Sequence, residues 1–105
     1  MSKPEDILNE NREQIDSLDQ KILELLNKRA KLSLNIAQIK SQNNIPVFVP
    51  ERENSLLEKI VSHNIGPFDS EAIRNIFLNI MDESKRLQRS LLTNQKEKNL
   101  HDDQQ

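Results

Sequence analysis

One uninterrupted stretch dominates this sequence, because no glycine or proline occurs between Pro4 and Pro46. Within it, apolar residues recur in steps of three and four, which is typical of one face of an α-helix. They are Ile15, Leu18, Ile22, Leu25, Leu32, Ile36 and Ile39. Pro4 with Glu5 and Asp6 indicates the helix start, since proline suits the first turn and acids favour the dipole there. We therefore predict one long helix over most of this stretch.

A second apolar stripe lies beside the first, which indicates that the long helix is contacted on two sides. It comprises Leu23, Leu26, Ala30, Leu34 and Ala37. A helix of this length spans about 55 Å, whereas a compact domain of this size has a radius of gyration of only about 13 Å. Because its own chain cannot wrap around it, we expect an intertwined homodimer in which two long helices pack along each other.

Two shorter helices are predicted after the linker "SQNNIPVFVP". Pro50 suits the first position of a helix that runs to about Asn64. Gly66 then favours the end of this helix, and Asp69 or Ser70 can cap a third helix. The apolar stripe of that helix is Ile73, Ile76, Phe77, Ile80, Leu87 and Leu91, interrupted by Ser84. The sequence thus predicts an all-α fold of three helices, forming one domain over residues 1–92.

The last residues differ in composition from the rest. The segment 93–105, "TNQKEKNLHDDQQ", has almost no apolar content. Such a segment cannot bury enough apolar surface to offset the entropy of ordering. We expect it to be a disordered tail or a linker.

Composition disfavours several classes of function. The net charge is -2, and basic and acidic residues are interleaved, so that no basic stripe favours nucleic acid. With no cysteine and two isolated histidines, the sequence predicts no metal site. No apolar run approaches the roughly 20 residues that span a bilayer, and the first ten residues lack the apolar core of a signal peptide. We expect a cytoplasmic protein with no membrane partner.

Polar residues interrupt the apolar stripes of the long helix. Arg29 fills the one gap in the first stripe, and Lys40 lies eleven positions later. At about 100° per residue these two cations lie within about 20° of each other, on one face. Arg12 lies about 100° away around the helix, so that it cannot easily reach the same pocket from the same chain.

The other two helices carry similar interruptions. Arg52 and Glu53 precede the apolar residues Leu56 and Leu57 by four positions. Ser84 and Gln88 are likewise four apart, at or beside the stripe of the third helix. Each helix thus contributes polar side chains to a face that its apolar residues would bury.

Together these seven residues favour binding of a small polyanion. Arginine grips a carboxylate with two hydrogen bonds, and a desolvated lysine supplies a point charge. The set contains no cysteine, no serine with a histidine base and no pair of carboxylates, so it suits nucleophilic or acid–base catalysis poorly. It suits a reaction driven by positioning and electrostatics.

Simpler interpretations stand beside this one. Arg29 could fix the register of a coiled coil, and Lys40 and Arg12 could be solvated side chains. Arg52 with Glu53 could be an exposed charge pair in a first helical turn, and Ser84 with Gln88 an ordinary helix surface. The joint placement on apolar faces is what favours a site.

The same residues form an ordered set of motifs. They occur in "NREQIDSLDQKILELLNKRAKLSLNIAQIK", in "PERE" and in "GPFDSEAIRNIFLNIMDESKRLQ". Along roughly residues 5 to 92 the chain resembles the all-helical class of chorismate mutase. The resemblance implies an intertwined dimer with two equivalent sites, each completed by a residue of the other subunit. One difference is Val49, where many relatives carry aspartate.

Roles for the seven residues follow from the resemblance. It implies that Arg12, from the other subunit, and Arg29 clamp the substrate carboxylates, with Ser84 assisting. Lys40 and Gln88 would hydrogen-bond the ether oxygen, Glu53 would bind the ring hydroxyl, and Arg52 would support the wall of the pocket. The implied [3,3] rearrangement of the dianion chorismate to prephenate needs neither a nucleophile nor a cofactor.

Two alternatives remain open. An isochorismate pyruvate lyase has the same fold and a similar cationic pocket, but glutamate is not expected there at position 53. A non-catalytic helical dimer, serving as a docking or regulatory module, would be expected to have lost Lys40, Gln88 or the arginines, and this sequence retains them.

Overall fold

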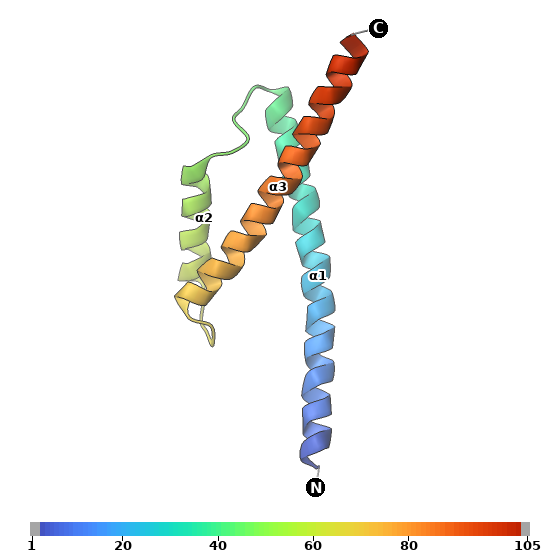
Figure 1. The fold of residues 1–105 in the computed structure, drawn as a ribbon. Coiled ribbons are helices and arrows are strands. Elements are labelled where there is room, and N and C mark those ends of the chain that lie inside the picture. The colour runs from blue at the N-terminus through green and yellow to red at the C-terminus, as the bar shows by residue number, and fades with distance from the viewer. Residues whose placement is uncertain (1–2, 104–105) are drawn as a thin grey trace. The chain divides into compact units, whose positions relative to one another are not determined.

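The computed structural model describes residues 3–103 and the side chains as far as Glu97. It contains three helices, α1 (Pro4–Gln42), α2 (Pro50–Ser62) and α3 (Ser70–Asp103), and no strand within the described residues (Figure 1). The all-α fold of three helices is therefore confirmed. The chain divides into two compact units, which meet after Lys31, and α1 belongs to both.

The long first helix has 39 residues, which corresponds to about 58 Å at 1.5 Å per residue. It ends at asparagines: Asn44 has a positive φ of 56°, a conformation that asparagine tolerates better than most residues. The backbone N–H of Ile45 donates to the carbonyl of Lys40 over 2.8 Å. This bond is typical of a helix C-terminus closed by a left-handed residue, and it fixes the backbone of the turn that carries Lys40.

The short connections follow the sequence signals. Pro50 occupies the start of α2, where the lack of an N–H costs nothing, and Val49 precedes it in an extended conformation. Gly66 has φ of 84°, in the region that favours glycine. Asp69 caps α3, since its Oδ1 accepts a hydrogen bond of 2.8 Å from the backbone N–H of Ala72.

The third helix is longer than the sequence analysis predicted. The segment 93–105 was expected to be a disordered tail or a linker, and α3 continues through it to Asp103. No glycine or proline interrupts it, and lysine, glutamate, glutamine and leucine are good helix formers even without burial.

The buried side chains of the described residues all lie in the second unit. Leu57 on α2 and Met81 on α3 are buried, and Ala37 on α1 is completely inaccessible to solvent. At the outer end of the packed pair α2 and α3, Arg74 bridges to Glu58 with a distance of 3.0 Å. A small core of this kind positions α2 and α3 but buries few large side chains.

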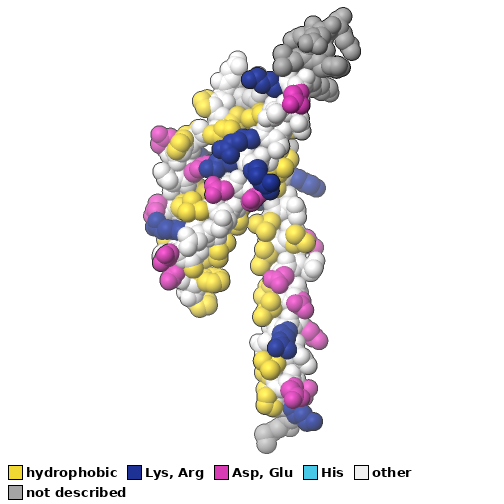
Figure 2. Space-filling model, viewed as in Figure 1, with side chains coloured by type: hydrophobic (Ala, Val, Ile, Leu, Met, Phe, Trp, Pro, Cys, Tyr) yellow, Lys and Arg dark blue, Asp and Glu magenta, His cyan; other side chains and the backbone are white. Residues whose placement is uncertain are grey.

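The first unit keeps its apolar residues exposed. Leu25 is 64% exposed, and the other large apolar side chains in this part of α1 are exposed as well (Figure 2). They are Ile7 and Leu8 near the start of the helix and the stripe residues Ile15, Leu18, Ile22, Leu23 and Leu26. None of the helices, over the part of the chain that the structure describes, combines the length and apolar content needed to cross a membrane.

Candidate active site

The seven predicted site residues fall into both units. Lys40, Arg52, Glu53, Ser84 and Gln88 belong to the second unit, and the contacts below concern that unit. Arg12 and Arg29 belong to the first unit, where Arg12 is exposed and Arg29 is partly buried.

Glu53 faces α3 from the first turn of α2. Its carboxylate Oε2 lies 3.2 Å from the ammonium Nζ of Lys85. Both side chains are partly buried, with 32% of Glu53 and 24% of Lys85 exposed. The ion pair holds the carboxylate of Glu53 against α3. Lys85 itself was not among the predicted residues.

Gln88 joins α3 to the last part of α1. Its side-chain Nε2 donates a hydrogen bond of 2.8 Å to the backbone carbonyl of Ser33. A primary amide has two N–H groups, so one remains to donate to a ligand. Ser33 and Lys40 are seven residues apart, which places them within about 20° on one face of α1, two turns apart. The hydrogen bond therefore anchors Gln88 to the helical segment that presents Lys40.

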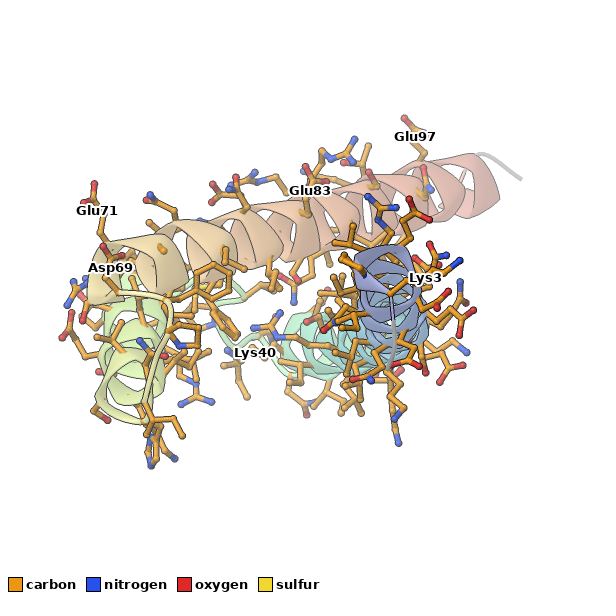
Figure 3. All side chains as sticks on the ribbon, turned by 90° about the horizontal axis from the view of Figure 1, so that it is seen from below. Lys3, Lys40, Asp69, Glu71, Glu83 and Glu97 are labelled. Atoms are coloured by element: carbon orange, nitrogen blue, oxygen red, sulfur yellow. The ribbon has the colours of Figure 1, made fainter. Side chains whose placement is uncertain are left out.

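Lys40 is a partly buried cation on the last turn of α1. Within residues 3–103 no ion pair involves its ammonium group. Figure 3 shows Lys40 on the same side of α3 as α2, whereas Glu71 and Glu83 point away from that side. Glu71 and Glu83 therefore do not compete with an anion for Lys40.

Arg52 lies next to Glu53 on α2, and Ser84 lies four residues before Gln88 on α3. Arg52 follows Pro50 on the first turn of α2 and is exposed, so its side chain does not share the partial burial of Glu53. Ser84 is partly buried on α3, one turn before Gln88. Arg52 is thus the more exposed of these two predicted site residues.

The linker before α2 is tied to α3 by a cation–π contact. The guanidinium carbon of Arg89 lies 5.1 Å from the ring centroid of Phe48. Such contacts contribute about 0.5–1 kcal/mol at exposed sites. This contact holds the chain shortly before Val49 and Pro50, and therefore restrains the first turn of α2, which carries Arg52 and Glu53.

The donor set of this unit suits binding rather than covalent chemistry. Lys40 and Gln88 are donors, Glu53 is an acceptor balanced by Lys85, and no cysteine is present in the chain. Among the described residues there is no cluster of three or more His, Cys, Asp or Glu side chains that could hold a metal ion. Fixed charges and dipoles of this kind can orient an anion and stabilise charge that develops on it.

Three helices, of which α1 and α3 carry the donors Lys40 and Gln88, define an all-helical protein whose donors suit a small anion. The sequence model of chorismate mutase type II matches residues 11–89. The chain belongs to the chorismate mutase type II family. The resemblance found in the motifs is thereby confirmed.

Individual relatives agree with this assignment. Over 88 residues the chain is 42% identical to the bifunctional chorismate mutase/prephenate dehydratase of Aquifex aeolicus, covering 80% of this chain and 24% of that protein. It is 35% identical over 96 residues to the chorismate mutase of Methanocaldococcus jannaschii, covering 88% of this chain and 94% of that protein. The chain therefore spans about a quarter of the bifunctional relative and nearly all of the single-function relative.

Solved structures show the same fold. The chorismate mutase of Thermus thermophilus (form II) superposes with a TM-score of 0.76 at 30% identity, covering 78% of this chain and 93% of that chain. The chorismate mutase of Helicobacter pylori, solved in complex with prephenate, gives a TM-score of 0.75 at 28% identity, covering 83% and 94% of the two chains.

Proposed function

We propose that this protein is a chorismate mutase that converts chorismate to prephenate by a [3,3] rearrangement. The observation that carries the proposal is the hydrogen bond between Gln88 and the Ser33 carbonyl, because it fixes an amide donor to the helix segment that presents Lys40. Lys40 on that segment of α1 and the second N–H of Gln88 on α3 are the two donors proposed for a single ligand oxygen. Family membership and the relatives named chorismate mutase support the same activity.

The reaction needs a shape and a charge pattern rather than a reactive group. The enolpyruvyl arm of chorismate must fold over the ring in a chair-like geometry, and negative charge grows on the ether oxygen as its bond to the ring breaks. In our proposal Lys40 and the second N–H of Gln88 donate to this oxygen, so that they stabilise the transition state more than the ground state. No cofactor is required.

The remaining residues bind and orient the substrate in this proposal. Arg12 and Arg29 clamp the two carboxylates, since arginine can donate two parallel hydrogen bonds to a carboxylate. Ser84 assists these two arginines, and Glu53 accepts a hydrogen bond from the ring hydroxyl. Arg52 supports the wall of the pocket.

We also propose that the active form is a homodimer in which Arg12 reaches the site of the other subunit. The exposed apolar residues of α1, among them Leu18 at 55% and Leu25 at 64%, support a second copy as the cover. Two long amphipathic helices packed along each other would bury both stripes at once. The angle of about 100° between Arg12 and the face of Arg29 and Lys40 favours a contribution across the dimer.

The cellular role follows from the same proposal. A chorismate mutase would supply prephenate for phenylalanine and tyrosine synthesis, and the name of the bifunctional relatives joins this activity to prephenate dehydratase. We propose that it acts in the cytoplasm, and the absence of cysteine fits a reducing compartment.

The direct test is a product assay with the purified chain. Chorismate is followed by its absorbance and prephenate is identified after acid conversion, with isochorismate as a second substrate. We expect chorismate loss matched by prephenate, and no pyruvate release from isochorismate. Pyruvate release from isochorismate without prephenate formation would instead identify a lyase, and turnover of neither substrate would contradict an enzymatic function.

A further inference from the structure

Among the side chains that the structure describes, two ion pairs join α2 to α3, and Lys85 makes the better protected of them. In its pair with Glu53 the side chains are 24% and 32% exposed, whereas those of Arg74 and Glu58 are 40% and 63% exposed. Water screens an exposed pair more strongly, and a partly buried pair holds its geometry better. The better protected pair is the one that contains a predicted site residue.

The geometry of the pair leaves half of the carboxylate available. Lys85 contacts Oε2 of Glu53, so that Oε1 can accept a hydrogen bond from another group. Lys85 Nζ also lies 3.4 Å from Oδ1 of Asp82, one turn earlier on α3. The ammonium group is thus held from two sides, by Asp82 toward solvent and by Glu53 toward α2.

A lone carboxylate would be a poor component of a site for a dianion. Glu53 would repel the substrate carboxylates, and the repulsion would be stronger where water is displaced. A cation at 3.2 Å balances that charge while the carboxylate remains able to accept a hydrogen bond. Lys85 therefore supplies what Glu53 needs to bind a neutral hydroxyl on an anionic molecule.

We propose that Lys85 is a positioning residue of the active site, which holds and neutralises the carboxylate of Glu53 so that Oε1 accepts the hydrogen bond of the substrate ring hydroxyl. This inference rests on the proposed function and extends it to a residue outside the seven. Lys85 acts through Glu53 and makes no contact with the reacting atoms. The simpler interpretation is that the ion pair of Lys85 with Glu53 only joins α2 to α3.

The chain provides a matched control for that interpretation. Arg74 links the same two helices through Glu58, with distances of 3.0 and 3.2 Å from its two terminal nitrogens. It lies eleven residues before Lys85 on α3 and beside none of the site residues in sequence. If Lys85 only joins helices, Lys85→Ala and Arg74→Ala should affect the enzyme in the same way.

The test compares steady-state kinetics of wild type, Lys85→Ala, Lys85→Arg and Arg74→Ala with chorismate. We expect Lys85→Ala to raise KM about tenfold with a smaller change in kcat, since a hydroxyl contact present in both ground and transition state mainly affects binding. Lys85→Arg should recover most of the loss, and Arg74→Ala should retain the wild-type KM. Equal KM values for Lys85→Ala and Arg74→Ala would overturn the proposal.

A double-mutant cycle with Glu53→Gln tests whether Lys85 acts through that carboxylate. We expect Lys85→Ala to change KM less than twofold in the Glu53→Gln background, because the group that it positions has been removed. Full additivity of the two effects would overturn the proposal. Lys85→Met, which keeps the apolar stem of the side chain, replaces Lys85→Ala in both comparisons if circular dichroism shows that the alanine variant does not fold.

These experiments distinguish a failure of the proposed function from a failure of the proposed role of Lys85. A wild-type chain that does not convert chorismate overturns the proposed function together with this role of Lys85. A wild-type chain that converts chorismate, with Lys85→Ala indistinguishable from Arg74→Ala, overturns the role of Lys85 alone.

Discussion

The side-chain amide of Gln88 on α3 donates a hydrogen bond of 2.8 Å to the backbone carbonyl of Ser33 on α1, across 55 positions of sequence. The acceptor is a main-chain atom, so that the contact depends on the path of α1 and on no particular side chain at position 33. It fixes the orientation of the amide plane, and with it the direction of the second N–H. A donor positioned in this way can act without reorganisation when charge develops on a substrate oxygen.

Gln88→Glu tests the role of this amide. An ionised carboxylate would repel both the Ser33 carbonyl and the developing charge on the ether oxygen, whereas a protonated carboxyl can donate to one of them. We expect kcat/KM of the variant, divided by that of wild type, to rise as pH falls from about 8 to about 5. The Gln88→Ala variant serves as the control, with a ratio that does not depend on pH. A flat ratio for Gln88→Glu would argue against Gln88 at the ether oxygen.

Lys40→Ala tests the electrostatic part of the mechanism. Lys40 is partly buried and forms no ion pair with the described residues, so the fold loses little when the charge is removed. We expect kcat/KM to fall by about a hundred- to a thousandfold, as for other fixed donors to a developing negative charge. Circular dichroism should show unchanged helicity, and the exposed cation Lys59 on α2 provides the control variant Lys59→Ala. Wild-type turnover by Lys40→Ala would refute the assignment.

Ala37→Leu tests how closely the helices must approach. Ala37 has no exposed surface and lies one turn beyond Ser33 on α1, so a larger side chain must displace its neighbours. Overpacking of this kind costs about 1–3 kcal/mol of unfolding free energy. Urea unfolding should reveal the loss, together with a lower kcat/KM because the Gln88 contact is disturbed. Gln38→Leu, at an exposed neighbouring position, should lose less than about 0.5 kcal/mol. Equal stabilities of the two variants would contradict the close packing at Ala37.

The exposed apolar stripes predict a stability that depends on protein concentration. If a second copy covers them, Tm should rise with concentration by mass action, and Leu25→Lys should lower Tm and shift the protein toward monomer in sedimentation experiments. Gln20→Lys adds the same charge at a polar position and should leave the dimer intact. A monomer at all concentrations, with a constant Tm, would contradict the proposed homodimer.

Local signals in the sequence predicted the helices well. Pro50, Gly66 and Asp69 act through backbone conformation or a short hydrogen bond, so their effects can be read from a few neighbouring residues. The extension of α3 to Asp103 was not predicted, because low apolar content says little about helix propensity, which depends on residue type.

The contacts of the site were harder to predict, because they join residues far apart in sequence. Glu53 and Lys85 are 32 positions apart, and nothing local to α2 identifies its partner on α3. A signal was nevertheless present: Lys85 follows Phe77 and buried Met81 at intervals of four, on a face that packs inward. A lysine at such a position requires an acidic partner, and Glu53 was already a candidate. The Gln88 contact left no comparable signal, because its acceptor is a backbone carbonyl.

The most direct test of a site shared between two subunits is complementation by two inactive variants. Arg12→Ala and Lys40→Ala chains are unfolded together and refolded as a 1:1 mixture, so that about half of the dimers contain one chain of each kind. If Arg12 serves the site of the other subunit, each mixed dimer has one intact site, and the mixture should recover about a quarter of the wild-type chorismate turnover. If Arg12 serves its own chain, every site lacks one of the two residues, and turnover no higher than that of the separate variants would contradict the account.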